Sequence, residues 1–504
     1  MLIKTGSLAL LLLLASRLTG LWRESAQAAA FGATGMGDVA VLMLTFPDWV
    51  TGMLASGALA YVLVPHWATQ TPAQRHPTQR QIGRGLLLGA VVLGLLIAAL
   101  RQPLTQILAG GLAPGLQLLA QQGLVWSALA LPAACMAALG VARLQFESDF
   151  VGMYSANLVV NGVLIVALSW LTFGNAQGNA TPALGLALCA AMGLRMVWVF
   201  RRIPKPAHGT LDTVSGLPQA PLPMASVWLW AALAAGLPLA LPLVARSMAS
   251  VGGEGALSTF NYAWKLVELP LVLAIQLVAT LAFPTIASAM ASGHGRTHTL
   301  TNEARQAVRG ALLLAWTLAC AAVAALQVGA AALASLLFGW GRMPAERLAD
   351  IATWSAIGAW GLLPQAVIAV ALVVLAAQRR LRLAAVAYAG ALLLWLVFGR
   401  FGTLGGTEVM WALNGVLCAI AVVMLSALVP KDTAHRRDHA MLPLRAAVPP
   451  TLALAAIAVA VNRVWRPDFP AGNLTPLWLC LGCGLGVVLI SFATSREFRL
   501  AVQR

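Results

Sequence analysis

Three basic side chains lie in or beside strongly apolar stretches of this chain. Arg17 lies late in the first stretch, Arg23 lies just beyond it, and Lys265 lies in a later one. If these stretches cross a membrane, an ionisable group inside them costs at least about 2.5–3.5 kcal/mol on insertion scales, so it faces a cavity or a partner. Three such cations predict an electropositive cavity that suits an anionic ligand, of which a phosphate or diphosphate is the obvious example.

Acidic residues accompany these cations. Glu24 follows Arg23 directly, Asp38 opens the second apolar stretch, and Glu268 lies three residues after Lys265. Because residues three apart share one face of a helix, we expect Glu268 to pair with Lys265. The alternative to a functional cavity is that these charges only neutralise one another and hold helices together.

Prolines and one glycine predict weak points in the helices. Pro47 lies in the second apolar stretch, Gly236 and Pro238 lie in the seventh, and Pro270 lies in the eighth. Proline removes a backbone hydrogen bond and kinks a helix, and broken helices can bend in transporters that alternate their access. We interpret these four residues as hinges, with static kinks as the alternative.

Membrane-spanning helices are the elements that must position these residues. Apolar stretches of about 20 residues, the length that a helix needs to cross the hydrocarbon core, follow one another from Leu8 to Phe492. Fourteen spans are predicted at about 3–22, 36–65, 82–100, 117–142, 150–173, 182–200, 224–247, 256–288, 308–338, 349–377, 382–400, 405–429, 446–463 and 474–493. The predicted fold class is therefore an all-α polytopic membrane protein.

The composition excludes most soluble functions. Hydrophobic residues make up 60% of the 504 residues and charged residues only 10%, and lipid can solvate that much apolar surface. The net charge of +16 is spread over short loops, which does not favour nucleic-acid binding. Cys480 and Cys483 form a C-x-x-C pair, but no second pair or histidine cluster completes a metal site. We predict neither a metal nor a cofactor.

The basic loops predict the orientation of the chain. Most Lys and Arg residues outside the spans lie near the two termini and in every second loop, for example Arg75, Arg201 and Arg379. Since cytoplasmic loops carry this excess, both termini are predicted to lie in the cytoplasm. Arg195 lies inside a span near Arg201 and Arg202, and we expect it to extend to the cytoplasmic surface.

A weak internal repeat suggests how the spans are organised. Residues 46–65 and 269–284, in spans two and eight, both place one proline near the middle of a long helix and another near its end. Spans six apart that match in this way predict two six-helix lobes around a central cavity. We expect an N-terminal lobe with a connecting loop at 1–223, a C-terminal lobe at 224–430, and two extra helices with a tail at 431–504.

Several motifs resemble one family. Residues 16–25 (S-R-L-T-G-L-W-R-E-S), 30–34 (A-F-G-A-T) and 37–38 (G-D) are similar to the opening of the MurJ/MviN lipid II flippases, which typically reads S-R-x-x-G-x-x-R-[DE], then F-G-A and an Asp. Residues 46–65 continue the resemblance with F-P, G-A-L and a closing V-P. Residues 261–270 (N-Y-A-W-K-L-V-E-L-P) are similar to the family's Y-Y-A-D-R-L-x-E-[FL]-P.

The resemblance implies a transporter of the multidrug/oligosaccharidyl-lipid/polysaccharide exporter superfamily in the bacterial inner membrane. Such a protein moves undecaprenyl-diphosphate-linked peptidoglycan precursor from the inner to the outer leaflet. The three cations would bind the diphosphate or sugar headgroup, and Asp38, with Glu24 and Glu268, would act in closing the cavity. The extra C-terminal helices would form a groove for the lipid tail. The implied partners are the lipid-linked saccharide and membrane lipid, not nucleic acid.

The chain departs from the family pattern at several positions. Thr51 and Gly52 stand where a basic residue is usual, Ser56 replaces Glu, Trp264 replaces Asp, and Lys265 replaces Arg. Lysine lacks the planar fork with which arginine grips a diphosphate. The chain is therefore predicted to be a divergent lipid II flippase or, alternatively, a flippase of another polyprenyl-linked saccharide such as an exopolysaccharide or O-antigen unit.

Two other function classes are less favoured. A drug or cation antiporter would use buried carboxylates, and Asp38, Asp48 and Glu268 are available, but the neighbouring cations favour an anion. A membrane enzyme such as a polyprenyl glycosyltransferase would need a large outer loop, and the predicted outer loops are short. The sequence contains no nucleotide-binding P-loop, so a membrane potential or an ion gradient would have to drive transport. The prediction is a transporter rather than an enzyme, without an assigned coupling ion.

Overall fold

The computed structural model describes residues 2–174, 180–204, 222–291, 302–378, 380–398, 404–428, 444–463 and 475–503. These residues form helices and connecting turns, without a β-strand among them. Backbone polar groups in lipid must find partners within their own segment, and a helix provides them. The predicted all-α fold class is confirmed.

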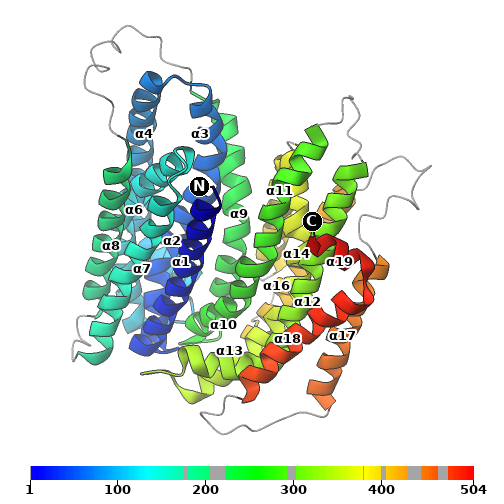
Figure 1. The fold of residues 1–504 in the computed structure, drawn as a ribbon. Helices are drawn as coiled ribbons and strands as arrows, with labels where there is room; N and C mark the ends of the chain where they lie inside the picture. Colours follow the sequence, from blue (N-terminus) through cyan, green and yellow to red (C-terminus); the bar gives the residue numbers. More distant parts are fainter. Residues whose placement is uncertain are drawn as a thin grey trace. The chain divides into compact units, whose positions relative to one another are not determined.

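The chain forms the following helices up to residue 270: α1 (Leu2–Phe31), α2 (Gly35–Met53), the π-helical segment η1 (Leu54–Ala58), α3 (Leu59–Ala68), α4 (Pro72–Ala99), α5 (Arg101–Leu108), α6 (Pro114–Phe146), α7 (Phe150–Phe173), α8 (Ala180–Arg202), α9 (Ala225–Ser250) and α10 (Ala256–Pro270) (Figure 1). After it come the π-helical segment η4 (Leu271–Ile275), α11 (Gln276–Ala291), α12 (Asn302–Phe338), α13 (Ala345–Ala359), α14 (Leu362–Ala377), α15 (Leu381–Phe398), α16 (Gly406–Leu428), α17 (Leu444–Arg463), α18 (Thr475–Thr494) and α19 (Arg496–Gln503).

Most of the predicted membrane spans correspond to single long helices. In the described part of the chain, nine helices are long and apolar enough to cross a membrane, and α13 and α14, bent by 49° at their junction, together provide a tenth. The other four predicted spans fall on α1, on the continuous run from α2 through η1 to α3, on α15 and on α17. The protein is therefore a multi-span membrane protein.

The contacts within the chain define two compact units. Unit 1 consists of Met1–Ser258 and Trp340–Pro344, and unit 2 consists of Thr259–Gly339 and Ala345–Arg504. Helix α9 packs against α2, η1 and α3 and so belongs to unit 1. The predicted lobes, which meet at residue 223, come from the sequence repeat and not from contacts. That division stays a prediction.

Helix α6 is the centre of unit 1, where it packs against α2, α4 and α8. In Figure 1, α1, α2, α6, α7 and α8 lie side by side in blue to cyan. Small residues let these helices approach closely, because a Cβ on Gly185 of α8 would overlap the Trp126 ring of α6, and a Cβ on Gly140 of α6 would overlap Val199 of α8. Small residues at such contacts are typical of helices packed within membranes.

Helix α12 is the centre of unit 2. It packs against α11, α13, α14, α17, α18 and α19, and it is rich in alanine. Gly329 of α12 lies so close to Cys480 of α18 that a Cβ there would meet the thiol-bearing side chain. Phe498 of α19 is buried beside Leu313 of α12 and Ala446 of α17, which holds this short helix onto the unit.

Two long helices change to π-helical geometry near a proline. Segment η1 interrupts the run from α2 to α3 seven residues after Pro47, and η4 follows Pro270 directly. These are the two helices that the sequence repeat pairs. A π-helical turn widens the backbone and often marks a functional site. In contrast, α9 stays helical from Ala225 to Ser250 although it contains Pro238 and Pro242.

Glycine is required where the loop at residues 340–344 meets the end of α1. Gly341 has a φ of +64°, and its position is so close to the Ala29 carbonyl that an added Cβ would collide with it. The next residue, Arg342, donates its N–H to the same carbonyl at 3.1 Å. The end of α1 therefore depends on a backbone conformation that residues with a side chain rarely adopt.

We expect Gly341→Ala to lower the free energy of unfolding by about 1–3 kcal/mol, because it adds left-handed backbone strain and a backbone collision. The measurement is thermal unfolding of the purified chain in detergent. Gly162→Ala in α7 is the control, since a Cβ there meets nothing within 4 Å, and alanine is favoured in a helix interior. Equal stability of the two variants would contradict this account of Gly341.

Candidate functional site

A group of buried charges lies in unit 1 around Arg23 of α1. Arg23 is 8% exposed, and its Nη2 lies 2.7 Å from Oε1 of Glu24 and 3.0 Å from Oδ2 of Asp48 on α2. Glu24 is also buried, whereas the Asp48 side chain is 42% exposed. The structure thus brings together Arg23 and Glu24, both predicted as site residues, with Asp48, which the sequence analysis considered only for the less favoured antiporter.

Arg195 of α8 is another buried cation of unit 1. It is 5% exposed, and Asp48 is the carboxylate that attracts it electrostatically. The expectation that Arg195 extends to the cytoplasmic surface is wrong. Seven residues separate it from the end of α8 at Arg202, about 10 Å along the helix axis, and its guanidinium is held inside unit 1. Only its unusual distance from the helix end signals this in the sequence.

Arg17 lies apart from these pairs. It is exposed on α1, and Tyr154 of α7 is a neighbour on which its charge acts. Six residues separate Arg17 from Arg23, which places the two side chains on different faces of the helix. The structure therefore gives these two predicted cations different surroundings, one open and one closed.

Lys265 and Glu268 form the pair that their spacing predicts. Lys265 Nζ lies 2.8 Å from Glu268 Oε2 on α10, and about a third or less of each side chain is exposed. Both residues belong to unit 2, whereas Arg17 and Arg23 belong to unit 1. The turn that follows Pro270, two residues beyond Glu268, is the π-helical segment η4.

Asp38 of α2 binds the beginning of α10. Its carboxylate accepts hydrogen bonds from the N–H groups of Gly255 and Ser258, each at 2.7 Å, and the residue is 1% exposed. The first N–H groups of a helix have no partner within it, and a carboxylate there also benefits from the helix dipole. Asp38 thereby joins α2 to the first residues of α10, within unit 1.

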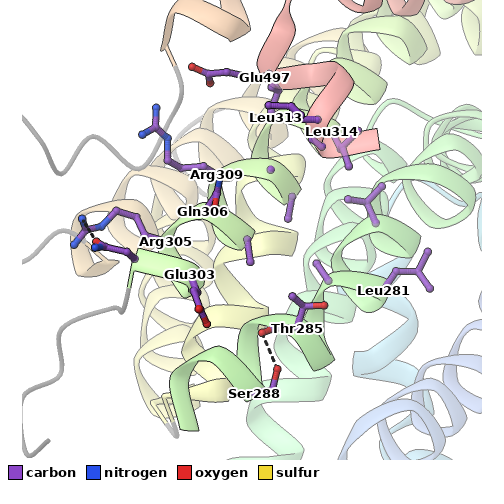
Figure 2. Close-up of a pocket in the computed structure, with 18 residues that line it drawn as sticks. Leu281, Thr285, Ser288, Glu303, Arg305, Gln306, Arg309, Leu313, Leu314 and Glu497 are labelled. Carbon is purple, nitrogen blue, oxygen red and sulfur yellow. Dashed lines mark hydrogen bonds between the residues drawn. The ribbon is translucent and has the colours of Figure 1, made fainter. Parts of the chain in front are cut away.

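A separate cavity of about 1110 Å³ lies within unit 2, between α11, α12 and α19. Figure 2 shows Leu281 on one side, Leu313 and Leu314 on another, and Arg305 and Arg309 at the edge. Glu303 and Glu497 also contribute to its lining, so the charges balance. None of the residues predicted from the sequence to bind substrate lies in this cavity.

Among the described residues, no group of three or more His, Cys, Asp or Glu side chains could hold a metal ion. The six cysteines are free thiols: three are buried, two are half-buried, and Cys418 is exposed. The arrangement instead offers cations inside helices, which can bind an anion.

The fold and these charges define a polytopic membrane protein with cations inside its helices. A solved structure titled as an inward-facing multidrug resistance MATE family transporter of the MOP superfamily matches it with a TM-score of 0.60 at 15% identity, over 89% of this chain and 98% of that one. A structure of the lipid II flippase MurJ in an inward closed conformation matches with a TM-score of 0.78 at 14% identity, over 96% and 99% of the two chains.

Sequence comparison identifies the family. Residues 27–479 match the model of the family described as lipid II flippase MurJ. The chain belongs to the MurJ family, as the motifs in spans one, two and eight suggest.

Two curated relatives agree with this assignment. Both are described as probable lipid II flippase MurJ. The one from Rhizobium meliloti is 26% identical over 69% of this chain and 65% of its own length, and the one from Rhizobium tropici is 24% identical over 56% and 54%. The chain thus spans less than two thirds of the length of these relatives.

We expect Asp38→Ala to lower the free energy of unfolding by about 1–3 kcal/mol, because two buried N–H groups at the start of α10 lose their acceptor. The measurement is again thermal unfolding in detergent. Asp350→Ala is the matched control, since Asp350 pairs with Arg347 at 3.3 Å with much of both side chains exposed, and such pairs contribute about 0–1 kcal/mol. A loss no larger than that of the control would show that the cap is dispensable.

Proposed function

We propose that this chain is a lipid II flippase, which moves undecaprenyl-diphosphate-linked peptidoglycan precursor from the inner to the outer leaflet by alternating access. The observation that carries the proposal is the family match over residues 27–479. The chain's own chemistry agrees with it, because a diphosphate that crosses hydrocarbon needs cations inside the protein.

We further propose that Arg17, Arg23 and Lys265 bind the diphosphate or sugar headgroup. Exposed Arg17 is suited to the first contact, since its guanidinium is accessible. Arg23 and Lys265 already have carboxylate partners, Glu24 and Glu268, so an anion would compete with these partners. Such exchange allows a site to bind an anion and later release it without leaving a bare buried charge.

Alternating access requires elements that bend and elements that close. We propose that Pro47 and Pro270 act as hinges with the π-helical segments that follow them, and that Gly236 and Pro238 act in α9. Gly236 accepts a hydrogen bond through its carbonyl from Trp49 Nε1 at 3.3 Å, which links α9 to α2. The bond of Asp38 to the start of α10 supports a role in closing the transport path at that end.

We propose that the two six-helix lobes at 1–223 and 224–430 are the moving parts and that the region 431–504 serves the lipid tail. The cavity of unit 2 supports the last point, because Leu500 and Ala501 of α19 contribute to its lining together with Leu281 and Leu314. An isoprenoid chain needs such apolar contacts.

The proposed location is the bacterial inner membrane, with both termini in the cytoplasm. The support is the family assignment and the basic residues in alternate loops. No coupling ion is proposed.

A flippase for another polyprenyl-linked saccharide is the second candidate, and one observation favours it. Thr51 is buried and donates its hydroxyl hydrogen bond to the Pro47 carbonyl at 2.5 Å. The position at which the family usually has a basic residue therefore holds a neutral side chain, whose hydroxyl already bonds to the backbone. A headgroup would meet one positive charge fewer there.

The test is rescue of a bacterium depleted of its own MurJ. We expect wild type to restore growth, and Arg17→Ala and Lys265→Ala to reduce rescue by about tenfold or more, because each removes a charged contact worth about 1.5–3 kcal/mol. The measurement is the plating efficiency, with protein abundance in the membrane measured in parallel.

Arg202→Ala is the matched control. Arg202 pairs with Asp149 at 2.8 Å, near the end of α8 and with much of its side chain exposed, and we expect full rescue. If well-expressed wild type does not rescue, lipid II is not the substrate, and the second candidate replaces the first. Full rescue by both Arg17→Ala and Lys265→Ala would contradict the proposal that these residues bind the headgroup.

A further inference from the structure

The junction between α13 and α14 is a break that none of the proposed hinges includes. The two helices bend by 49° where Trp360 and Gly361 separate them. The Trp360 N–H donates to the Ile357 carbonyl, three residues back, at 3.2 Å, whereas a regular α-helix bonds four residues back. Pro364 has no N–H to offer the Trp360 carbonyl, so a regular helix cannot run through this point. The break is therefore built into the sequence of this span.

Two amide side chains from neighbouring helices bond to the carbonyls at this break. Gln327 Nε2 of α12 donates to the Ala356 carbonyl at 2.6 Å, and Asn414 Nδ2 of α16 donates to the Ile357 carbonyl at 2.7 Å. In a regular helix these two carbonyls would accept the N–H groups four residues ahead. A backbone carbonyl that loses its helical partner inside a membrane is costly. The two amides therefore compensate for bonds that the break removes.

Close packing brings α16 and α10 against the break. Asn414 is 6% exposed, and a Cβ added to Gly361 would lie 2.5 Å from its Oδ1. One turn earlier, a Cβ added to Gly358 would lie 3.3 Å from Sδ of Met410 on α16 and 3.1 Å from Cγ2 of Val267 on α10. A change of angle at the break would therefore move the chain against both of these helices.

One polar atom at the break has no partner at the angle that the structure shows. Oδ1 of Asn414 is buried and has no hydrogen-bond partner among the described residues. Buried acceptors are rarely left unpaired in native proteins. The first N–H groups of α14 lack partners within their own helix, and this oxygen lies against Gly361, directly before them. A change of angle that brings one of these N–H groups to Oδ1 would satisfy both.

The break also packs beside the π-helical segment η4. Segment η4 contacts both α14 and α12. Val267, which meets Gly358, lies three residues before Pro270, where α10 ends and η4 begins. Because protein interiors are close-packed, two helices in contact cannot keep their packing if one bends and the other stays rigid. Bending at η4 thus requires a matching change at the break.

We propose that the junction of α13 and α14 is a further hinge of unit 2, which bends together with η4. Gln327 and Asn414 are positioning residues that hold this hinge at one angle, and exchange of their hydrogen bonds changes the angle. The inference rests on the proposed function, since alternating access is the process that requires unit 2 to bend. A static kink, in contrast, would respond to a substitution only at the substituted contact.

The experiment measures hydrogen–deuterium exchange of the full-length chain in detergent by mass spectrometry. We expect Asn414→Leu, which keeps the size of the side chain and removes its polar atoms, to raise exchange about tenfold at residues 356–363. We expect a rise of about tenfold in η4 as well, because the two segments bend together. Gln327→Met should give the same pattern, and it decides the test if Asn414→Leu does not fold.

Asn161→Leu is the matched control. Asn161 is 7% exposed on α7 of unit 1, and its Nδ2 donates to Thr19 Oγ1 at 3.2 Å, so this variant loses a buried amide contact elsewhere. Its exchange in η4 and at residues 356–363 should equal that of wild type. For the two unit 2 variants, a rise confined to the break, no rise, or an equal rise throughout the chain overturns the proposal.

The reverse substitution tests the coupling from the other side, since coupling between two sites is reciprocal. Pro270→Ala restores a backbone N–H beside η4 and stiffens the helix there. Exchange at residues 356–363 should then fall about fivefold. Unchanged exchange at these residues would show that the break and η4 move independently.

The rescue test separates this inference from the proposed function. Rescue by wild type without the coupled exchange would leave the flippase function standing and remove the hinge. Coupled exchange without rescue would keep the hinge and exclude lipid II as the substrate. If wild type rescues, Asn414→Leu should reduce rescue about tenfold at equal abundance in the membrane, and full rescue would overturn the role of this hinge in transport.

Discussion

A charge inside a membrane-spanning helix must find its partner within the protein, since lipid offers none. This constraint explains the arrangement of unit 1 around Arg23. Its guanidinium bonds to Glu24 on its own helix and to Asp48 on α2, and Asp48 in turn attracts Arg195 on α8. The packing of α1, α2 and α8 is thereby tied to a network that is electrically balanced in the absence of a ligand.

The same constraint acts on the backbone. Each helix satisfies its own interior N–H and C=O groups, but its ends do not. The N–H groups at the beginning of α10 donate to the carboxylate of Asp38. The Ala29 carbonyl near the end of α1 accepts a hydrogen bond from the N–H of Arg342. Two helices depart from regular α-helical geometry, at the π-helical segments η1 and η4. A π-helical turn keeps its backbone groups hydrogen-bonded. A change of helical geometry and continuous backbone hydrogen bonding therefore exist in one helix.

The proposed transport of an anion requires that the anion also be released. Two arginine forks without a competing group would hold a diphosphate strongly, while two buried cations without a counterion would be unstable in the empty protein. Carboxylates that already pair with a cation, as Glu24 and Asp48 pair with Arg23, resolve both difficulties.

The sequence by itself determined the fold class, most of the spans and the pair of Lys265 with Glu268, because hydrophobic length and helical spacing are local properties of the chain. It also indicated the family through short motifs. Only the tertiary structure decided that Asp38 caps α10 and that Arg195 lies in the interior of unit 1. Contacts between residues more than 140 positions apart depend on which helix faces are packed together, and hydropathy does not encode that choice. Arg195 therefore looked like a surface residue in the sequence, although the packing of α8 against its neighbours buries it.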